Sequence, residues 1–180
     1  MSLIVRAVCA TKLPTLTFDD NRRFRDLLAD LFPGISITDS VSAELEKAIA
    51  EVAAAMRVDL TPAQLEKIWQ LHLACEQRIG IIIVGPSGSG KSTLWEVLEK
   101  AYERVGRKPI LYKMNPKAMP RQQLLGSMNL DTREWSDGVL TAAARKVVKE
   151  PLEQRSWIIC DGDVDPEWIE SLNSVLDDNR

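Results

Sequence analysis

The chain has 180 residues, of which 45% are hydrophobic and 27% charged, a balance typical of a globular protein with enough apolar mass for a core. Its formal net charge is -3, so there is no basic field to attract nucleic acid or an anionic membrane surface. No apolar run approaches the length of a membrane span. The cysteines Cys9, Cys75 and Cys160 are isolated, show no metal-binding spacing and favour a reducing, intracellular compartment.

The first 78 residues predict a mainly helical segment. Residues 3–8 fit either a strand or a helix end, because the apolar run is too short to decide. Helices are expected over residues 17–32, 41–56 and 61–78, the first and third opening with a capping box. On the first, Phe24, Leu27, Leu28, Leu31 and Phe32 are expected to line one side. His72, the only histidine, is expected to be structural rather than catalytic.

From residue 79 onwards the pattern changes to alternating strands and helices. Strands are expected over residues 81–84, 109–113 and 156–161. Helices are expected after residue 90, over 139–149 and over 166–176, with a short helical turn at 121–126. Residues 130–138 read as a polar loop, with Asp137 as the cap of the helix that follows. Such alternation predicts a parallel α/β sheet.

A glycine-rich loop carries the strongest functional signal in the chain. Gly85, Gly90, Lys91 and Ser92 match the phosphate-binding pattern G-x-x-x-x-G-K-[ST], between a predicted buried strand and a predicted helix. Glycines let backbone N–H groups point inward as an anion nest, and the helix N-terminus adds unpaired donors. Lys91 would reach the β- and γ-phosphates of a nucleotide, and the Ser92 hydroxyl would ligate Mg²⁺.

An acid at the end of the last predicted strand supplies the second half of the site. Asp161 follows four apolar residues and would emerge at the carboxyl edge of the sheet, where it can hold a Mg²⁺-bound water opposite Ser92. Many ATPases of this architecture have glutamate next, but here Gly162 stands in that position, and Asp163 is only a weak surrogate for the missing base. The sequence therefore predicts a site that holds ATP–Mg²⁺ with slow or no turnover.

Four segments together resemble one protein family. These are GPSGSGKST at residues 85–93, NPKAM at 115–119, DTREWSDG at 131–138, and the stretch from WIICDGD to LDDN at 157–179. They resemble the second AAA+ module of a dynein heavy chain, and FRDLLADLFPGI at residues 24–35 is similar to the segment that leads into that module. The sequences of residues 115–126 and 132–145 resemble the cytoplasmic dynein of intraflagellar transport more than the general cytoplasmic or axonemal forms.

The resemblance implies a P-loop NTPase (AAA+) core with a parallel sheet flanked by helices over residues 79–180, truncated at its C-terminus, after a helical lead-in segment over residues 1–78. It implies a microtubule motor with a ring of six AAA+ modules, in which the second module binds ATP without the catalytic glutamate. The implied cofactors are ATP or ADP and Mg²⁺. The implied partners are the neighbouring modules, the accessory chains and, through the full-length protein, microtubules. The implied location is cytoplasmic, on the cytoskeleton and in the cilium or flagellum.

The resemblance also assigns site residues. The phosphate loop comprises Gly85, Pro86, Ser87, Gly88, Ser89, Gly90, Lys91, Ser92 and Thr93. Ser92 and Asp161 stand at the metal, Asp161 through water. Candidate contacts to the adenine base are Leu31, Phe32, Pro33, Gly34 and Ile35.

Two other hypotheses stay open at this point. A freestanding small P-loop ATPase or kinase would show intrinsic turnover, against which Gly162 argues. A pure interaction scaffold would bind no nucleotide at all, even at high ATP–Mg²⁺ concentration.

Overall fold

The computed structural model describes residues 2–13, 16–33, 43–151, 153–163 and 165–173. The chain forms two compact units, Met1–Lys47 and Ala48–Arg180, and the division falls inside helix α3 (Ala43–Ala55).

The first unit contains helices α1 (Ser2–Lys12) and α2 (Phe18–Leu31), so residues 3–8 are helical rather than extended. Its core is small and consists of Val5 and Cys9 from α1 and Leu28 from α2. Thr17 caps α2 as predicted, because its hydroxyl oxygen accepts the N–H of Asp20 at 3.3 Å.

One prediction about α2 is wrong, since Leu27 and Leu31 are exposed rather than part of the apolar side. On a helix these two positions lie on the flank of the stripe that Leu28 marks, and a single neighbouring helix covers only a narrow stripe.

The second unit begins with three helices in sequence: α3, α4 (Pro62–Gln77) and α5 (Lys91–Arg104). The predicted capping box of α4 is present, with Gln64 N–H donating to the Thr61 hydroxyl and Thr61 N–H donating to the Gln64 side chain. Helix α5 buries one face along its length, made of Leu94, Val97, Leu98, Ala101 and Tyr102. The first and last of these helices are joined by an ion pair between Glu51 and Arg104.

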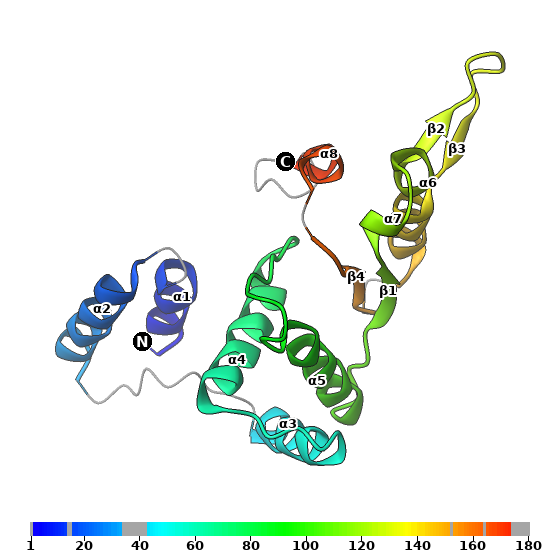
Figure 1. Ribbon diagram of the computed structural model, residues 1–180. Coiled ribbons are helices and arrows are strands. Elements are labelled where there is room, and N and C mark those ends of the chain that lie inside the picture. Colours follow the sequence, from blue (N-terminus) through cyan, green and yellow to red (C-terminus); the bar gives the residue numbers. More distant parts are fainter. Residues whose placement is uncertain (1, 14–15, 34–42, 152, 164, 174–180) are drawn as a thin grey trace. The chain divides into compact units, whose positions relative to one another are not determined.

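The sheet consists of β1 (Ile110–Met114) and β4 (Ser156–Cys160), which pair in parallel with Ile110 opposite Ser156 (Figure 1). Helix α7 (Val139–Lys149) covers one face, where Leu140 and Ala143 pack in one core with Met114 of β1. On the other face, Trp157 of β4 meets Tyr102 of α5 with ring centroids 5.8 Å apart. Helices on both faces of a parallel pair confirm the α/β prediction.

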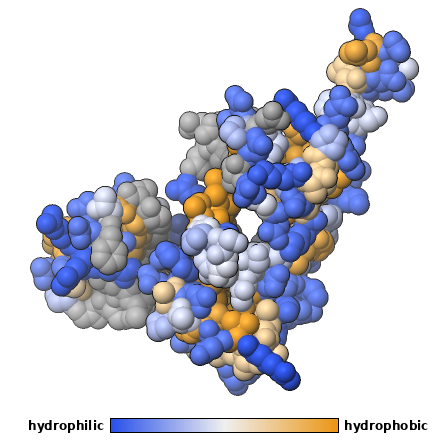
Figure 2. Space-filling model, in the orientation of Figure 1, coloured by the Kyte–Doolittle hydropathy of each residue, from blue (hydrophilic) through white to orange (hydrophobic). Residues whose placement is uncertain are grey.

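The predicted strand over residues 81–84 does not form: residues 78–86, all of which the structure describes, contain no strand. Ile82 is 61% exposed and Val84 87% exposed, and this segment contributes to the orange surface in Figure 2. The physical reason is that a strand needs a hydrogen-bonding neighbour, whereas β1 and β4 pair with each other and not with this segment.

A hairpin replaces part of the predicted polar loop. Short helix α6 (Arg121–Leu125) leads into β2 (Gly126–Met128), which pairs antiparallel with β3 (Trp135–Asp137), and the hairpin projects beyond α6 and α7 (Figure 1). A 3₁₀ turn at Pro116–Ala118 precedes α6.

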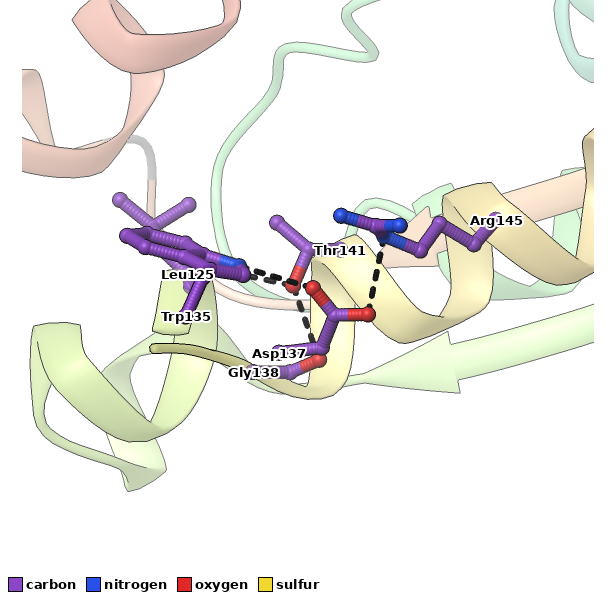
Figure 3. A network of polar contacts seen from close by, with 6 residues as sticks. All are labelled: Leu125, Trp135, Asp137, Gly138, Thr141 and Arg145. Carbon is purple, nitrogen blue, oxygen red and sulfur yellow. Dashed lines mark hydrogen bonds and ion pairs between the residues drawn. The ribbon is translucent and has the colours of Figure 1, made fainter. Parts of the chain in front are cut away.

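The prediction that Asp137 caps α7 is also wrong, since Gly138 is the N-cap residue. The Asp137 carboxylate instead accepts the indole N–H of Trp135 at 2.8 Å and pairs with Arg145 of α7 at 2.9 Å (Figure 3). Thr141 donates its hydroxyl to the backbone carbonyl oxygens of Leu125 and Gly138 in the same network. Asp137 therefore fixes the base of the hairpin to α7 rather than capping the helix.

The last described elements are α8 (Pro166–Ile169) and a 3₁₀ turn (Glu170–Leu172), which together follow the predicted helix over 166–176 as far as residue 173. Its remaining residues lie outside the described part of the chain. Trp168 of α8 is buried in the same core as α7.

Candidate nucleotide-binding site

The glycine loop is built from backbone conformations that side chains disfavour. Gly88 and Gly90 have φ values of +80° and +89°, in the left-handed region. The N–H of Ser89 donates to the carbonyl oxygen of Pro86 at 3.2 Å, which closes a turn. A Cβ at Gly85 would lie only 2.9 Å from the Ser89 hydroxyl oxygen. Glycines at these positions thus allow the tight loop that precedes α5, and such a loop fits a phosphate group at a helix N-terminus.

Lys91 folds back over this loop. Its ammonium group donates to the carbonyl oxygens of Gly85 and Pro86, at 2.8 Å each. The next residue, Ser92, is exposed, and Thr93 is half-buried in the first turn of α5. The positive charge of Lys91 therefore lies across the loop, where it can attract an anion. The exposed Ser92 lies beside it at the start of α5.

Asp161 comes directly after β4 and stays attached to the sheet, because its N–H donates to the carbonyl oxygen of Met114 at 2.9 Å. Its carboxylate pairs with the ammonium of Lys113 at 2.9 Å. The same ammonium lies 5.1 Å from the ring centroid of Trp95, one turn along α5 from Lys91. One lysine of β1 thus connects the predicted metal-binding acid with the helix that follows the phosphate loop.

Gly162 lies against Asn115, the first residue of the NPKAM segment that carries part of the family resemblance, although the resemblance gave this residue no role at the site. A Cβ at this position would be 2.9 Å from Oδ1 of Asn115, which itself accepts the N–H of Lys117 at 3.1 Å. A longer side chain at position 162 would have to displace Asn115.

The surrogate base candidate, Asp163, pairs with Lys117 at 2.6 Å. This hydrogen bond and the charge of Lys117 lower the pKa of Asp163, and the charge of Lys91 lowers the pKa further by a smaller amount. Lys91 and the loop after β4 are therefore close enough for their charges to interact.

Residues proposed for the adenine pocket lie in the first unit. Leu31 ends α2 and is exposed, Phe32 packs against the core of that unit, and Pro33 is exposed. Gly34 and Ile35 lie outside the described residues. The base contacts therefore stay a prediction.

An aromatic cluster joins α4, α5 and β4. Nδ1 of His72 is 2.5 Å from the Tyr102 hydroxyl, and the Trp69 ring meets the His72 ring edge-on at a centroid distance of 5.9 Å. Glu76 of α4 pairs with Arg155, the residue before β4, at 2.6 Å. Burial lowers the pKa of His72, the charges of Arg155 and Arg107 lower it further, and the charge of Glu76 opposes them. His72 thus has a structural partner that no sequence signal indicated.

Sequence reasoning missed Lys113, Asn115 and Lys117 as neighbours of the site. A signal for Lys113 was present, since a lysine inside an otherwise apolar strand calls for a charged partner. The partner itself depends on the register of β1 against β4, which the sequence does not specify. Asn115 and Lys117 lie in the NPKAM segment of the family resemblance, but the resemblance assigned neither of them a role at the site.

Among the described residues, no group of three or more His, Cys, Asp or Glu side chains could hold a metal ion. A magnesium ion here would be held by the nucleotide together with Ser92 and, through water, Asp161, which suits the preference of Mg²⁺ for phosphate, hydroxyl and water oxygens. No helix within the described ranges is long and apolar enough to span a membrane.

Two protein-family models match this chain. Residues 80–180 match the family model described as AAA domain (dynein-related subfamily). Residues 1–92 match the model described as hydrolytic ATP binding site of dynein motor region. The chain therefore carries a AAA domain, the class to which the parallel strands and the glycine loop also point.

Individual relatives narrow the assignment. The chain is 80% identical to cytoplasmic dynein 2 heavy chain 1 of Chlamydomonas reinhardtii over 178 residues, and 52% identical to the proteins of that name from Mus musculus and Homo sapiens over the same length. Each alignment covers 99% of this chain and 4% of the relative. The chain belongs to the dynein heavy chain family, as the motif resemblance predicted.

Proposed function

We propose that this chain forms the ATP-binding part of the second AAA+ module of a dynein heavy chain, and that it holds ATP–Mg²⁺ with little or no hydrolysis. The observation that carries the proposal is the glycine loop, in which Gly88 and Gly90 have positive φ and the ammonium of Lys91 lies against the carbonyl oxygens of Gly85 and Pro86 at the start of α5. In this proposal residues 79–180 are the core of the module and residues 1–78 lead into it.

Slow turnover follows from position 162. A general base must come within hydrogen-bond reach of the attacking water, and glycine has no group that accepts a proton. Asp163 is the nearest acid that could replace it, but its carboxylate is engaged by Lys117 and its pKa is lowered, which makes it a weak base. Bound ATP would then act by favouring one arrangement of the neighbouring modules.

The wider role is proposed from the relatives. The relatives are named cytoplasmic dynein 2 heavy chain 1, which is the name of a motor subunit. This chain spans only 4% of their length. We extend to this chain a role in a cytoplasmic microtubule motor of intraflagellar transport, located on the ciliary cytoskeleton. The neighbouring modules and the accessory chains would be its partners there.

Isothermal titration calorimetry with ATP–Mg²⁺ and ADP–Mg²⁺ tests the binding site. Lys91→Ala should weaken ATP binding by at least about tenfold, because it removes a charge-assisted contact to phosphate. Lys100→Ala, an exposed lysine further along α5, is the matched control and should bind like the wild type. A folded wild-type chain that binds neither nucleotide would support the scaffold hypothesis instead.

A phosphate-release assay tests the absence of turnover. The wild type should release phosphate no faster than Lys91→Ala. Robust release that disappears in Asp163→Ala would show that Asp163 serves as the base, and the proposed mechanism would be wrong.

A further inference from the structure

Lys113 lies on the face of the sheet that the proposed nucleotide site uses. In the parallel register it stands opposite Ile159, so Asp161 follows two residues later on the same face. Trp157 shares that face and contacts Tyr102 of α5. Lys113 therefore points between the sheet and α5, at the carboxyl end of the strands.

The ammonium of Lys113 has two neighbours there, the Asp161 carboxylate at 2.9 Å and the ring of Trp95 at 5.1 Å from its centroid. The side chains of Lys113 and Asp161 are 47% and 41% exposed. Ion pairs this open to water are weak, with coupling of about 1 kcal/mol at most, so the pair can be exchanged for another cation. The Trp95 ring keeps a favourable contact with the ammonium of Lys113 once the carboxylate is taken.

We propose that Lys113 is the resident counter-cation of Asp161 and competes with Mg²⁺ for this carboxylate, which makes nucleotide binding only weakly dependent on Mg²⁺. When Mg²⁺ is scarce, Lys113 neutralises Asp161 and spares the nucleotide phosphates its repulsion. With Mg²⁺ bound, Asp161 would serve the ion through water, and Lys113 would give up the carboxylate while keeping its contact with Trp95. The inference rests on the proposed ATP site, and it makes Lys113 a positioning residue that acts through Asp161.

The test measures ATP affinity by calorimetry with Mg²⁺ and with EDTA. The readout is the dissociation constant in EDTA divided by the dissociation constant with Mg²⁺. Lys113→Met keeps the length of the side chain and removes its charge. The ratio should rise by about fivefold over the wild type, the equivalent of an exposed ion pair at the upper end of its range. Lys117→Met is the matched control, because Lys117 pairs with Asp163 instead and should leave the ratio unchanged. An unchanged ratio in Lys113→Met overturns the proposal.

A titration with Mn²⁺ at saturating ATP, followed by electron paramagnetic resonance, reads the metal directly. Lys113→Met should bind Mn²⁺ about fivefold tighter than the wild type and Lys117→Met, and the added substitution Asp161→Asn should cancel the gain. Equal Mn²⁺ affinities in variants that all bind ATP overturn the role of Lys113 and leave the ATP site standing. A wild type that binds no ATP in the calorimetry rejects the ATP site, and the inference falls with it.

Discussion

At the scale of single residues, the base of the β2–β3 hairpin leaves no room for a side chain at either of its two glycines. Gly126 has a φ of +105°, and a Cβ there would lie 2.4 Å from the carbonyl oxygen of Ser136 and 2.7 Å from the Trp135 ring. Gly138 faces it with a comparable lack of room, since its Cβ would be 2.4 Å from the N of Gly126. Backbone atoms cannot move aside as a flexible side chain can, so both positions require glycine.

Gly126→Ala should therefore lower the free energy of unfolding by about 3 kcal/mol, through clash and left-handed strain together. Gly106→Ala provides the control, because Gly106 has a φ of +75° with nothing within 4 Å of its Cβ position. It should lose only the strain of the left-handed conformation, about 1 kcal/mol. Urea denaturation of both variants measures the difference, and equal losses would show that the contact at Ser136 is not limiting.

Local patterns in the sequence indicate candidate site residues but not the side chains that they contact. A motif indicates Lys91 and a strand end indicates Asp161, and both assignments stay predictions. Asp161 was expected to face a metal, yet the side chain it contacts is Lys113, from a strand some fifty residues earlier in the chain. Such a pair arises from strand register, which local patterns do not contain.

At the scale of elements, local signals decided which predictions succeeded. The helices α4 and α5 begin and end close to their predicted bounds, because a capping box, a Pro at the first turn and a 3.6-residue apolar period are all local. Two predictions were wrong: segment 81–84 was expected to be a strand, and residues 135–137 of the β2–β3 hairpin were expected to be loop. Strands form only where another segment lies alongside to pair with them, and local patterns do not show this. The helical periodicity of α4 likewise gave no hint that His72 meets Tyr102.

The contact of α4 with α5 should depend on pH through His72. Burial lowers the pKa of His72 in the folded chain below the ordinary value of 6.5, so the unfolded chain binds the proton more readily. The free energy of unfolding should be unaffected above pH 6.5 and should fall as the pH drops from 6.5 through the lowered folded pKa. Because His72 is the only histidine in the chain, few other groups titrate in this window.

Denaturant unfolding between pH 7.5 and 5 measures this slope, and His72→Gln should remove most of it. A slope that His72→Gln leaves unchanged would assign it to other groups. The ion pair of Glu76 with Arg155 acts in a separate window, since the lowered pKa of Glu76 reduces stability only as the pH falls below its ordinary value of 4.5.

At the scale of the whole molecule, family boundaries and compact units divide the chain differently. The two family models overlap at residues 80–92, on the phosphate loop, whereas the compact units divide within α3. The matches reflect where dynein sequences share ancestry, and the units reflect which residues bury one another. Both family models include the phosphate loop. Its motif is local, so it could be predicted from the sequence without knowing where a family match or a compact unit ends.

The exposed apolar segment before that loop should make the chain self-associate. Ile79 is 66% exposed, Ile82 61% and Val84 87%, in a run whose β-branched residues favour pairing with another strand. Val84→Lys should weaken association about thirtyfold, the equivalent of losing about 2 kcal/mol of buried valine surface. Val148→Lys is the matched control, since Val148 on α7 is 84% exposed but stands outside such a run. Sedimentation velocity over a range of concentrations measures the effect. If both variants and the wild type associate equally, segment 79–84 is not the contact. Another exposed apolar surface, such as Met128 and Leu130 of the hairpin, would then mediate the association.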